Sequence, residues 1–173
     1  MRAKILLAVF LIIGATAIFF FAHHDRKVLP GGTTIDRILV EKSERKLSIL
    51  RDGKVLKTYR VALGRNPIGA KEQEGDNKTP EGTYTIDYRN PTSDYHLALH
   101  ISYPSAEDTT RAAQRGVNAG FDIEIHGLPN GRAWMGAAHR QKDWTAGCIA
   151  VTDEEIDELY RVTADGTTVE IRP

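Results

Sequence analysis

The sequence predicts a mainly β domain over residues 35–173 with one or two short helices, preceded by an apolar N-terminal segment. Two observations favour this fold class. Short apolar runs, many with alternating polar residues, recur from Ile35 onward and are separated by turn-forming residues. Only two stretches carry the residues that typically cap the start of a helix.

The composition excludes several classes of protein. The chain has 173 residues, enough for one domain once the N-terminal segment is set aside. Its 23 basic and 23 acidic residues balance, so no basic excess indicates a nucleic-acid partner. The single cysteine, Cys148, forbids an internal disulfide and a cysteine-rich metal site.

The N-terminus predicts a membrane anchor over residues 1–22. An uncharged run, residues 5–22, follows two basic side chains and would rise about 27 Å as a helix, enough to cross the hydrocarbon core. Phenylalanines occupy positions 19–21, where a secretory signal would place the small residues of its cleavage site. We expect an uncleaved anchor, with a cleaved signal as the alternative, and a linker over residues 23–34.

The strands are predicted from apolar runs between turn signals. Asp52-Gly53 joins two such runs and predicts a tight hairpin, because both residues tolerate positive φ. Tyr84, Ile86 and Tyr88 alternate with polar residues and are expected to share one face of a strand. The predicted strands cover residues 35–42, 46–50, 54–63, 82–88, 97–103, 121–126, 149–151 and 167–172.

Two helices and two long loops complete the expected organisation. A helix is predicted over residues 105–116, and a second begins at Thr152, where Thr152 and Glu155 form a capping box. Two long loops are predicted, because they are rich in turn-forming residues or lack the hydrophobic periodicity of a helix or strand: residues 64–82 and 128–144. Long ordered loops are often functional.

Cys148 and His126 are the candidate pair for chemistry. A cysteine is nucleophilic as a thiolate, and a neighbouring imidazole can generate one. His126 ends an apolar strand and precedes Gly127, whose carbonyl could hold Nδ1–H and leave Nε2 free to accept a proton. The amides of Gly147 and Cys148 could bind a developing oxyanion. On spacing alone, a buried structural cysteine and a structural histidine remain the alternatives.

The other histidines give no convincing metal site. His96 and His100 flank one predicted strand and could face the same side, but no third ligand accompanies them at suitable spacing. We therefore expect neither a metal nor another cofactor.

Three motifs in order resemble the L,D-transpeptidase catalytic domain, also called the YkuD domain. I-H-G-L precedes T-A-G-C-I-A-V-T-D-E-E-I-D-E-L, which is similar to the family's His-Gly and Ser/Thr-His-Gly-Cys signatures. G-D-N-K-T-P-E-G-T-Y-T-I resembles its Thr-Pro-x-Gly segment, and Y-H-L-A-L-H-I-S-Y-P resembles a small proteobacterial branch. The matches span residues 36–172.

The resemblance implies a β-sandwich-like catalytic domain over residues 35–173 that acts on peptidoglycan stem peptides. Cys148 would be the nucleophile, His126 the general base and the Gly127 carbonyl the group that orients it, with Gly147 and Cys148 in the oxyanion region. The acyl group of the diamino acid would form a thioester with Cys148 and pass to an amine. The implied location is the periplasmic face of the inner membrane, or the periplasm if the N-terminal segment is cleaved.

The chain departs from the family pattern at Ala146, which stands where relatives carry the histidine of Ser/Thr-His-Gly-Cys. His139, nine positions before Cys148, is a candidate replacement, and an exposed loop histidine is the alternative. Arg132 and Arg140 are candidate partners for a substrate carboxylate or else solvated charges. Trp144 and Thr145 are further candidates for substrate contact, with Trp144 equally consistent with packing beneath the cysteine.

Two other functions stay open on the sequence. The same cysteine could transfer the acyl group to water, as in an L,D-carboxypeptidase or an amidase. A non-catalytic peptidoglycan-binding domain is the third reading, but it would not require Cys148, His126 and Gly147 together.

Overall fold

The computed structural model describes residues 28–173, and the chain divides into a unit over Met1–Gly31 and a compact domain over Gly32–Pro173. The predicted anchor, residues 1–22, lies outside the described residues, as does the start of the predicted linker. From residue 28 onward no helix is long and apolar enough to cross a membrane.

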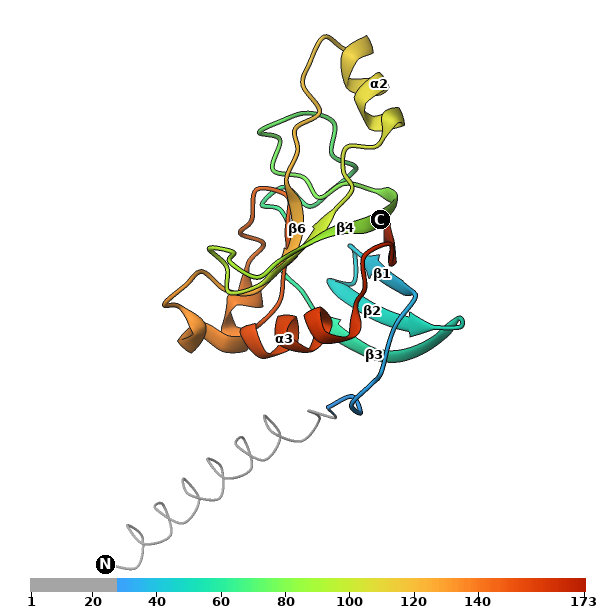
Figure 1. Ribbon diagram of the computed structural model, residues 1–173. Coiled ribbons are helices and arrows are strands. Elements are labelled where there is room, and N and C mark those ends of the chain that lie inside the picture. The colour runs from blue at the N-terminus through green and yellow to red at the C-terminus, as the bar shows by residue number, and fades with distance from the viewer. Residues whose placement is uncertain (1–27) are drawn as a thin grey trace, which may run out of the picture. The chain divides into compact units, whose positions relative to one another are not determined.

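Eight strands form one curled sheet in the order β3-β2-β1-β8-β4-β5-β6-β7 (Figure 1). The long strand β4 joins the two parts of the sheet, pairing with β8 on one side and β5 on the other. The predicted mainly β class is confirmed, but a continuous curled sheet replaces two separate sandwich layers. The strands are β1 (Arg37–Glu41), β2 (Lys46–Arg51), β3 (Lys54–Arg60), β4 (Gly82–Asn90), β5 (Ala98–Ile101), β6 (Ile123–His126), β7 (Ile149–Ala150) and β8 (Thr168–Arg172).

The β2–β3 hairpin forms as its turn residues predict. Asp52 and Gly53 have φ angles of 51° and 74°, the left-handed conformation that a two-residue hairpin turn needs at both positions. The two strands pair antiparallel.

Strand β4 differs from the predicted alternation at Tyr88. Tyr84 and Ile86 are buried, whereas Tyr88 is 54% exposed. The pairing register with β5 shifts between Ile86 and Tyr88, and such an irregularity redirects the side chains beyond it. Ile86 pairs with Ile101 and Tyr88 with the adjacent His100, so the expectation that all three share one face is wrong for Tyr88.

Both predicted α-helices are present, at opposite ends of the domain (Figure 1). Helix α2 (Ala106–Gln114) begins after Ser105, whose side chain accepts from the Asp108 amide in a capping box. Helix α3 (Asp153–Val162) begins after Thr152, which forms the predicted capping box with Glu155. A 3-10 segment, η1 (Ala133–Gln141), interrupts the loop that the sequence left without an element.

Helix α3 packs its apolar face against β5 and β6. Ile156 and Leu159 are completely buried and Val162 nearly so. Since β6 ends at His126, the packing of α3 fixes the strand that carries the candidate base.

We predict that Thr152→Ala will lower the free energy of unfolding by about 1 kcal/mol, because the Glu155 amide loses its side-chain acceptor. Urea unfolding followed by circular dichroism measures the change. Thr110→Ala, on the exposed face of α2, is the matched control and should shift stability by less than about 0.5 kcal/mol. Equal effects of the two substitutions would contradict the capping role.

Candidate active site

The parallel pairing of β6 and β7 brings the two candidate residues together. Ile125 pairs with Ile149 and His126 with Ala150, so Cys148 enters β7 beside the strand that ends at His126. A separation of 22 positions in the sequence thus becomes adjacency on neighbouring strands. Both side chains line one cleft of about 540 Å³.

His126 is held in one tautomer by the residue that follows it. Its Nδ1 lies 2.7 Å from the Gly127 carbonyl oxygen, which can only accept, so Nδ1 carries the proton. Nε2 is left as the basic nitrogen. The imidazole is 2% exposed and packs against the rings of Tyr95 and Trp144, with centroid separations of 4.4 Å and 5.7 Å.

Gly127 can carry out this role only without a side chain. A Cβ there would lie 2.8 Å from Asp153 Oδ1 and 2.9 Å from the Tyr95 carbonyl oxygen, closer than real Cβ contacts. Its amide donates to the carbonyls of Tyr95 and Leu97, and the next amide, of Leu128, donates to Asp153 Oδ1. The peptide that orients His126 is therefore fixed on both sides.

The turn T-A-G-C before β7 is organised by the Thr145 hydroxyl. This buried group accepts from the Gly147 amide at 3.1 Å and donates to the Cys148 carbonyl at 2.7 Å. Gly147 has a φ of 144°, which strongly favours glycine. The Gly147 N–H already donates to Thr145 Oγ1, so an oxyanion at this turn would share that donor with Thr145. The Cys148 amide is the other candidate donor, and it lies next to the thiol itself.

His126 is buried and Cys148 half-buried, and this loss of water favours the neutral form of both side chains. It raises the pKa of the Cys148 thiol to about 11, against a smaller opposing effect of the Glu124 backbone. It lowers the pKa of His126 to about 4, with the Gly127 hydrogen bond acting in the opposite direction. The thiol proton is directed at the Asp122 carbonyl oxygen, 3.6 Å from Sγ. At neutral pH the resting pair is therefore a thiol and a neutral imidazole.

The wall facing this turn comes from the loop between β3 and β4. Gly64 packs so closely that a Cβ would lie 2.2 Å from the Asn77 carbonyl oxygen, and a Cβ on Gly147 would lie 2.8 Å from that of Lys78. The Gly64 amide donates to Thr79 Oγ1 and the Arg65 amide to the Thr145 carbonyl. The long loop is thus an ordered wall of the cleft, and the hydrogen bond from the Gly64 amide to buried Thr79 stabilises it.

Of the predicted substrate residues, Trp144 and Thr145 line the cleft. Arg140 pairs with Glu155 of α3, and Arg132 is exposed in the segment before η1; neither is among the residues that line the cleft. His139 is buried behind Trp144, whose indole Nε1 donates to His139 Nδ1 at 3.3 Å. Burial lowers the pKa of His139 to about 4, so it is a neutral acceptor for the indole.

The other two histidines in the described part of the chain, His96 and His100, bond separate carboxylates. His96 Nε2 lies 2.8 Å from Asp157 Oδ1, and His100 Nδ1 lies 2.6 Å from Asp87 Oδ1. Across residues 28–173 there is no group of three or more His, Cys, Asp or Glu side chains that could hold a metal ion.

Sequence reasoning missed several residues that line the cleft. They come from segments far from Cys148 in the chain: the glycine-rich loop over residues 64–82, the segment before β5 and the strand that ends at His126. The missed residues are Arg65, Lys71, Glu74, Gly75, Tyr95, Gly120, Phe121, Asp122, Ile123 and Glu124.

A cysteine beside a tautomer-fixed histidine in a cleft defines the class of cysteine–histidine sites. The L,D-transpeptidase catalytic domain (YkuD) family matches residues 35–171. The chain therefore belongs to the L,D-transpeptidase catalytic domain family.

Individual relatives are more distant. "Putative L,D-transpeptidase YafK" of Escherichia coli K12 is 27% identical over 130 residues, which cover 72% of this chain and 45% of YafK. "Putative L,D-transpeptidase YqjB" of Bacillus subtilis is 28% identical over 137 residues, 76% of this chain and 68% of that protein. The chain thus spans less than half of YafK.

Among solved structures, the fold is similar to that of a point variant of the helical cell shape determining protein Pgp2 from Campylobacter jejuni. The TM-score is 0.62 and the identity 26%, over 82% of this chain and 48% of that chain.

We predict that Gly127→Ala will cut the rate of Cys148 alkylation by iodoacetamide at pH 7 at least about tenfold, because the added methyl displaces the carbonyl that orients His126. Intact-mass spectrometry follows the single thiol. Gly31→Ala is the control, since a Cβ there meets nothing within 4 Å. An unchanged rate in folded Gly127→Ala protein would exclude the orienting role.

Proposed function

We propose that this chain is a peptidoglycan-modifying cysteine acyltransferase that forms a thioester with a stem peptide and passes the acyl group to an amine. Membership of the L,D-transpeptidase family supports the substrate class. The observation that carries the proposal is the fixed tautomer of His126: Nδ1 bonds the Gly127 carbonyl, and the basic Nε2 remains for a proton in the cleft that holds Cys148.

In the first half-reaction the Sγ–H proton moves to His126 Nε2 as Sγ attacks the carbonyl carbon of the scissile amide. The tetrahedral oxyanion forms next to the Cys148 amide, which can donate to it. The C–N bond then breaks, and the leaving amine takes the proton from His126. A thioester on Cys148 and a released D-amino acid are the products.

In the second half-reaction an acceptor amine attacks the thioester. Neutral His126 accepts a proton from that amine, the C–S bond breaks, and the proton returns to Sγ. Because both partners are neutral at rest, the proton moves as the nucleophile attacks rather than before it, which is general-base catalysis.

The location proposed for this chemistry is outside the cytoplasmic membrane, where the stem peptides are. The apolar run over residues 5–22 supports an anchor that holds the domain at the periplasmic face of the inner membrane. Separation of membrane and soluble fractions, followed by intact-mass analysis of the N-terminus, distinguishes an anchor from a cleaved signal.

We predict that incubation with purified muropeptides will give cross-linked or amine-exchanged products, identified by mass, together with release of a terminal D-amino acid. Cys148→Ser should abolish both products and the acyl-enzyme adduct. Shortened peptides alone would show that water is the acceptor and the chain a carboxypeptidase. Unmodified peptides with active-site thiol intact would contradict the proposed function.

The burial of His126 predicts an unusual acid limb for the acylation rate. An imidazole of pKa about 4 is still a base at pH 5, so the rate should stay flat from pH 8 to 5 and fall only towards pH 4. An ordinary histidine would lose half its rate near pH 6.5, at about its unperturbed pKa. Single-turnover acylation rates measured across this pH range give the midpoint of the acid limb. His96→Ala, which removes a histidine from an exposed ion pair, is the control. A midpoint near 6.5 would contradict the buried, neutral base.

A further inference from the structure

Lys71 is a buried cation on the wall of the cleft that also holds Cys148 and His126. Its side chain is 4% exposed, and its ammonium donates to Asp76 Oδ1 at 2.8 Å and to the Gln73 carbonyl at 3.1 Å. A buried charge is costly unless it is paired, so this lysine needs Asp76 to remain charged.

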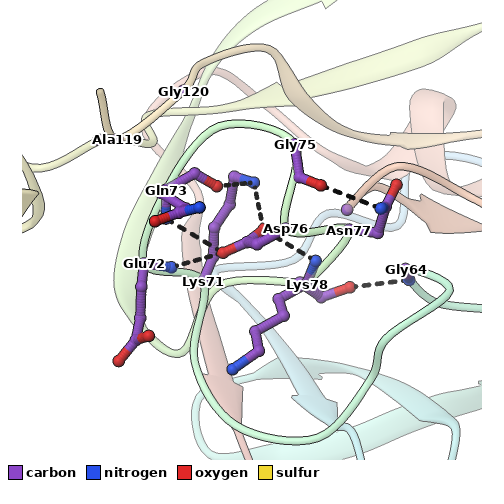
Figure 2. A network of polar contacts seen from close by, with 12 residues as sticks. Gly64, Lys71, Glu72, Gln73, Gly75, Asp76, Asn77, Lys78, Ala119 and Gly120 are labelled. Carbon is purple, nitrogen blue, oxygen red and sulfur yellow. Dashed lines mark hydrogen bonds and ion pairs between the residues drawn. The ribbon is translucent and has the colours of Figure 1, made fainter. Parts of the chain in front are cut away.

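Only one member of the ion pair, Lys71, lies on the wall of the cleft. Figure 2 shows the Lys71 and Asp76 side chains pointing toward each other within the loop. Lys71 lines the cleft, whereas Asp76 is not among the lining residues. The cationic member of the pair is therefore the one that borders the cleft of Cys148 and His126, and it also borders a second cavity on the other side of the loop.

The carboxylate of Asp76 is already satisfied by the backbone. Oδ2 accepts from the amides of Glu72 and Gln73, and Oδ1 accepts from the amide of Lys78 as well as from Lys71. Hydrogen bonds from Lys71 and from these amides hold the pKa of Asp76 below its usual range in spite of burial. Asp76 therefore stays ionised beside Lys71, and of the two charges it is that of Lys71 that lies on the cleft wall.

The charges around the Cys148 thiol make a cation on the cleft wall useful. Asp122 and Glu124 flank it, and both act against a thiolate, while Lys71 acts in its favour. The cleft also holds Glu74 and Arg65 at its exposed rim. Burial of the thiol adds to the cost of charging it, since desolvation disfavours the anion.

The loop is also held close to the nucleophile by its backbone. Gly120 leaves room for the Lys71 side chain, because a Cβ there would lie 3.3 Å from Lys71 Cε. The Glu74 amide donates to the Asn118 carbonyl at 2.8 Å, which ties the loop to the segment before Asp122. The ammonium therefore has little freedom to leave the cleft wall.

We propose that Lys71 is the cation that stabilises negative charge on Cys148 Sγ, and that Asp76 is the positioning residue that holds this ammonium on the cleft wall. The inference rests on the proposed function for its place in the reaction, where it assists the departure of the proton from Sγ to His126. It does not depend on which acceptor takes the acyl group.

Alkylation of the single cysteine by iodoacetamide tests the inference without any peptidoglycan substrate. In the full 173-residue chain, Lys71→Met should slow alkylation at pH 8 about five- to tenfold, the effect of losing a nearby opposite charge. Lys71→Gln keeps a donor without the charge and should slow it equally, which covers the case in which Lys71→Met fails to fold. Lys71→Arg keeps the charge and should stay within about twofold of wild type, as should the exposed control Lys54→Met.

Asp76→Asn separates positioning from simple charge. Removing a negative charge near the thiol would by itself speed alkylation, whereas releasing the Lys71 ammonium from its anchor should slow it. We expect slower alkylation than in the exposed control Asp165→Asn. Faster alkylation would overturn the positioning role of Asp76.

Wild-type rates in folded Lys71→Met and Lys71→Gln, or an equal loss in Lys71→Arg, would overturn the role of the lysine charge. These outcomes are independent of the muropeptide assay. A chain that alkylates as expected but gives no peptide product would contradict the proposed function alone.

Discussion

The pairing of the two-residue strand β7 is the constraint on which the candidate site depends. On one side β7 runs parallel to β6, and on the other Ala150 exchanges two backbone hydrogen bonds with Ala62. The preceding turn is held in the same way, since the Thr145 amide donates to the Leu63 carbonyl and its own carbonyl accepts from Arg65. The nucleophile candidate is thus set between two segments that are distant in sequence.

Charge at this site is controlled mainly by the removal of water. Burial alone opposes both the thiolate and the imidazolium, and the acidic neighbours of Cys148 oppose the thiolate further. A preformed pair of thiolate and imidazolium would have to overcome these unfavourable effects at rest. A neutral pair with the positive charge of Lys71 on the cleft wall avoids that cost and stabilises negative charge as it develops during attack. The arrangement suits a nucleophile whose negative charge develops only as it attacks.

Local sequence patterns predicted the elements that depend on local chemistry. The Asp52-Gly53 turn and the Thr152 capping box required only neighbouring residues, and both formed. The strand that ends at His126 and the strand that follows Cys148 were also predicted from their apolar runs, and the structure pairs them. The position of Tyr88 could not be predicted, because a register irregularity between two strands is invisible in one strand's alternation.

The residues that line the cleft around Cys148 and His126 were harder to predict than Cys148 and His126 themselves. Lys71 lies in a glycine-rich loop, and nothing in its neighbours shows that Asp76 folds back to pair with it. Arg140 looked equally suited to bind a carboxylate, but Glu155 of the adjacent helix occupies its guanidinium. In both cases the fold of the loop determines which carboxylate pairs with the basic side chain. The sequence shows that the side chain is charged but not which residue it pairs with.

The fold of the loop also determines what surrounds Ala146, the residue that stands where relatives carry a histidine. It is exposed and lines the cleft beside Trp144, while His139, the candidate for the missing family histidine, lies buried behind that indole and accepts its proton. The lining therefore includes a single imidazole, that of His126, among the residues that the structure describes. Under the proposed reaction the same Nε2 must serve both half-reactions: it returns the first proton to the leaving amine before it can accept one from the acceptor. Return of that proton must therefore precede the second step, and exposed Ala146 lines the cleft in which an acceptor amine or water would approach the thioester.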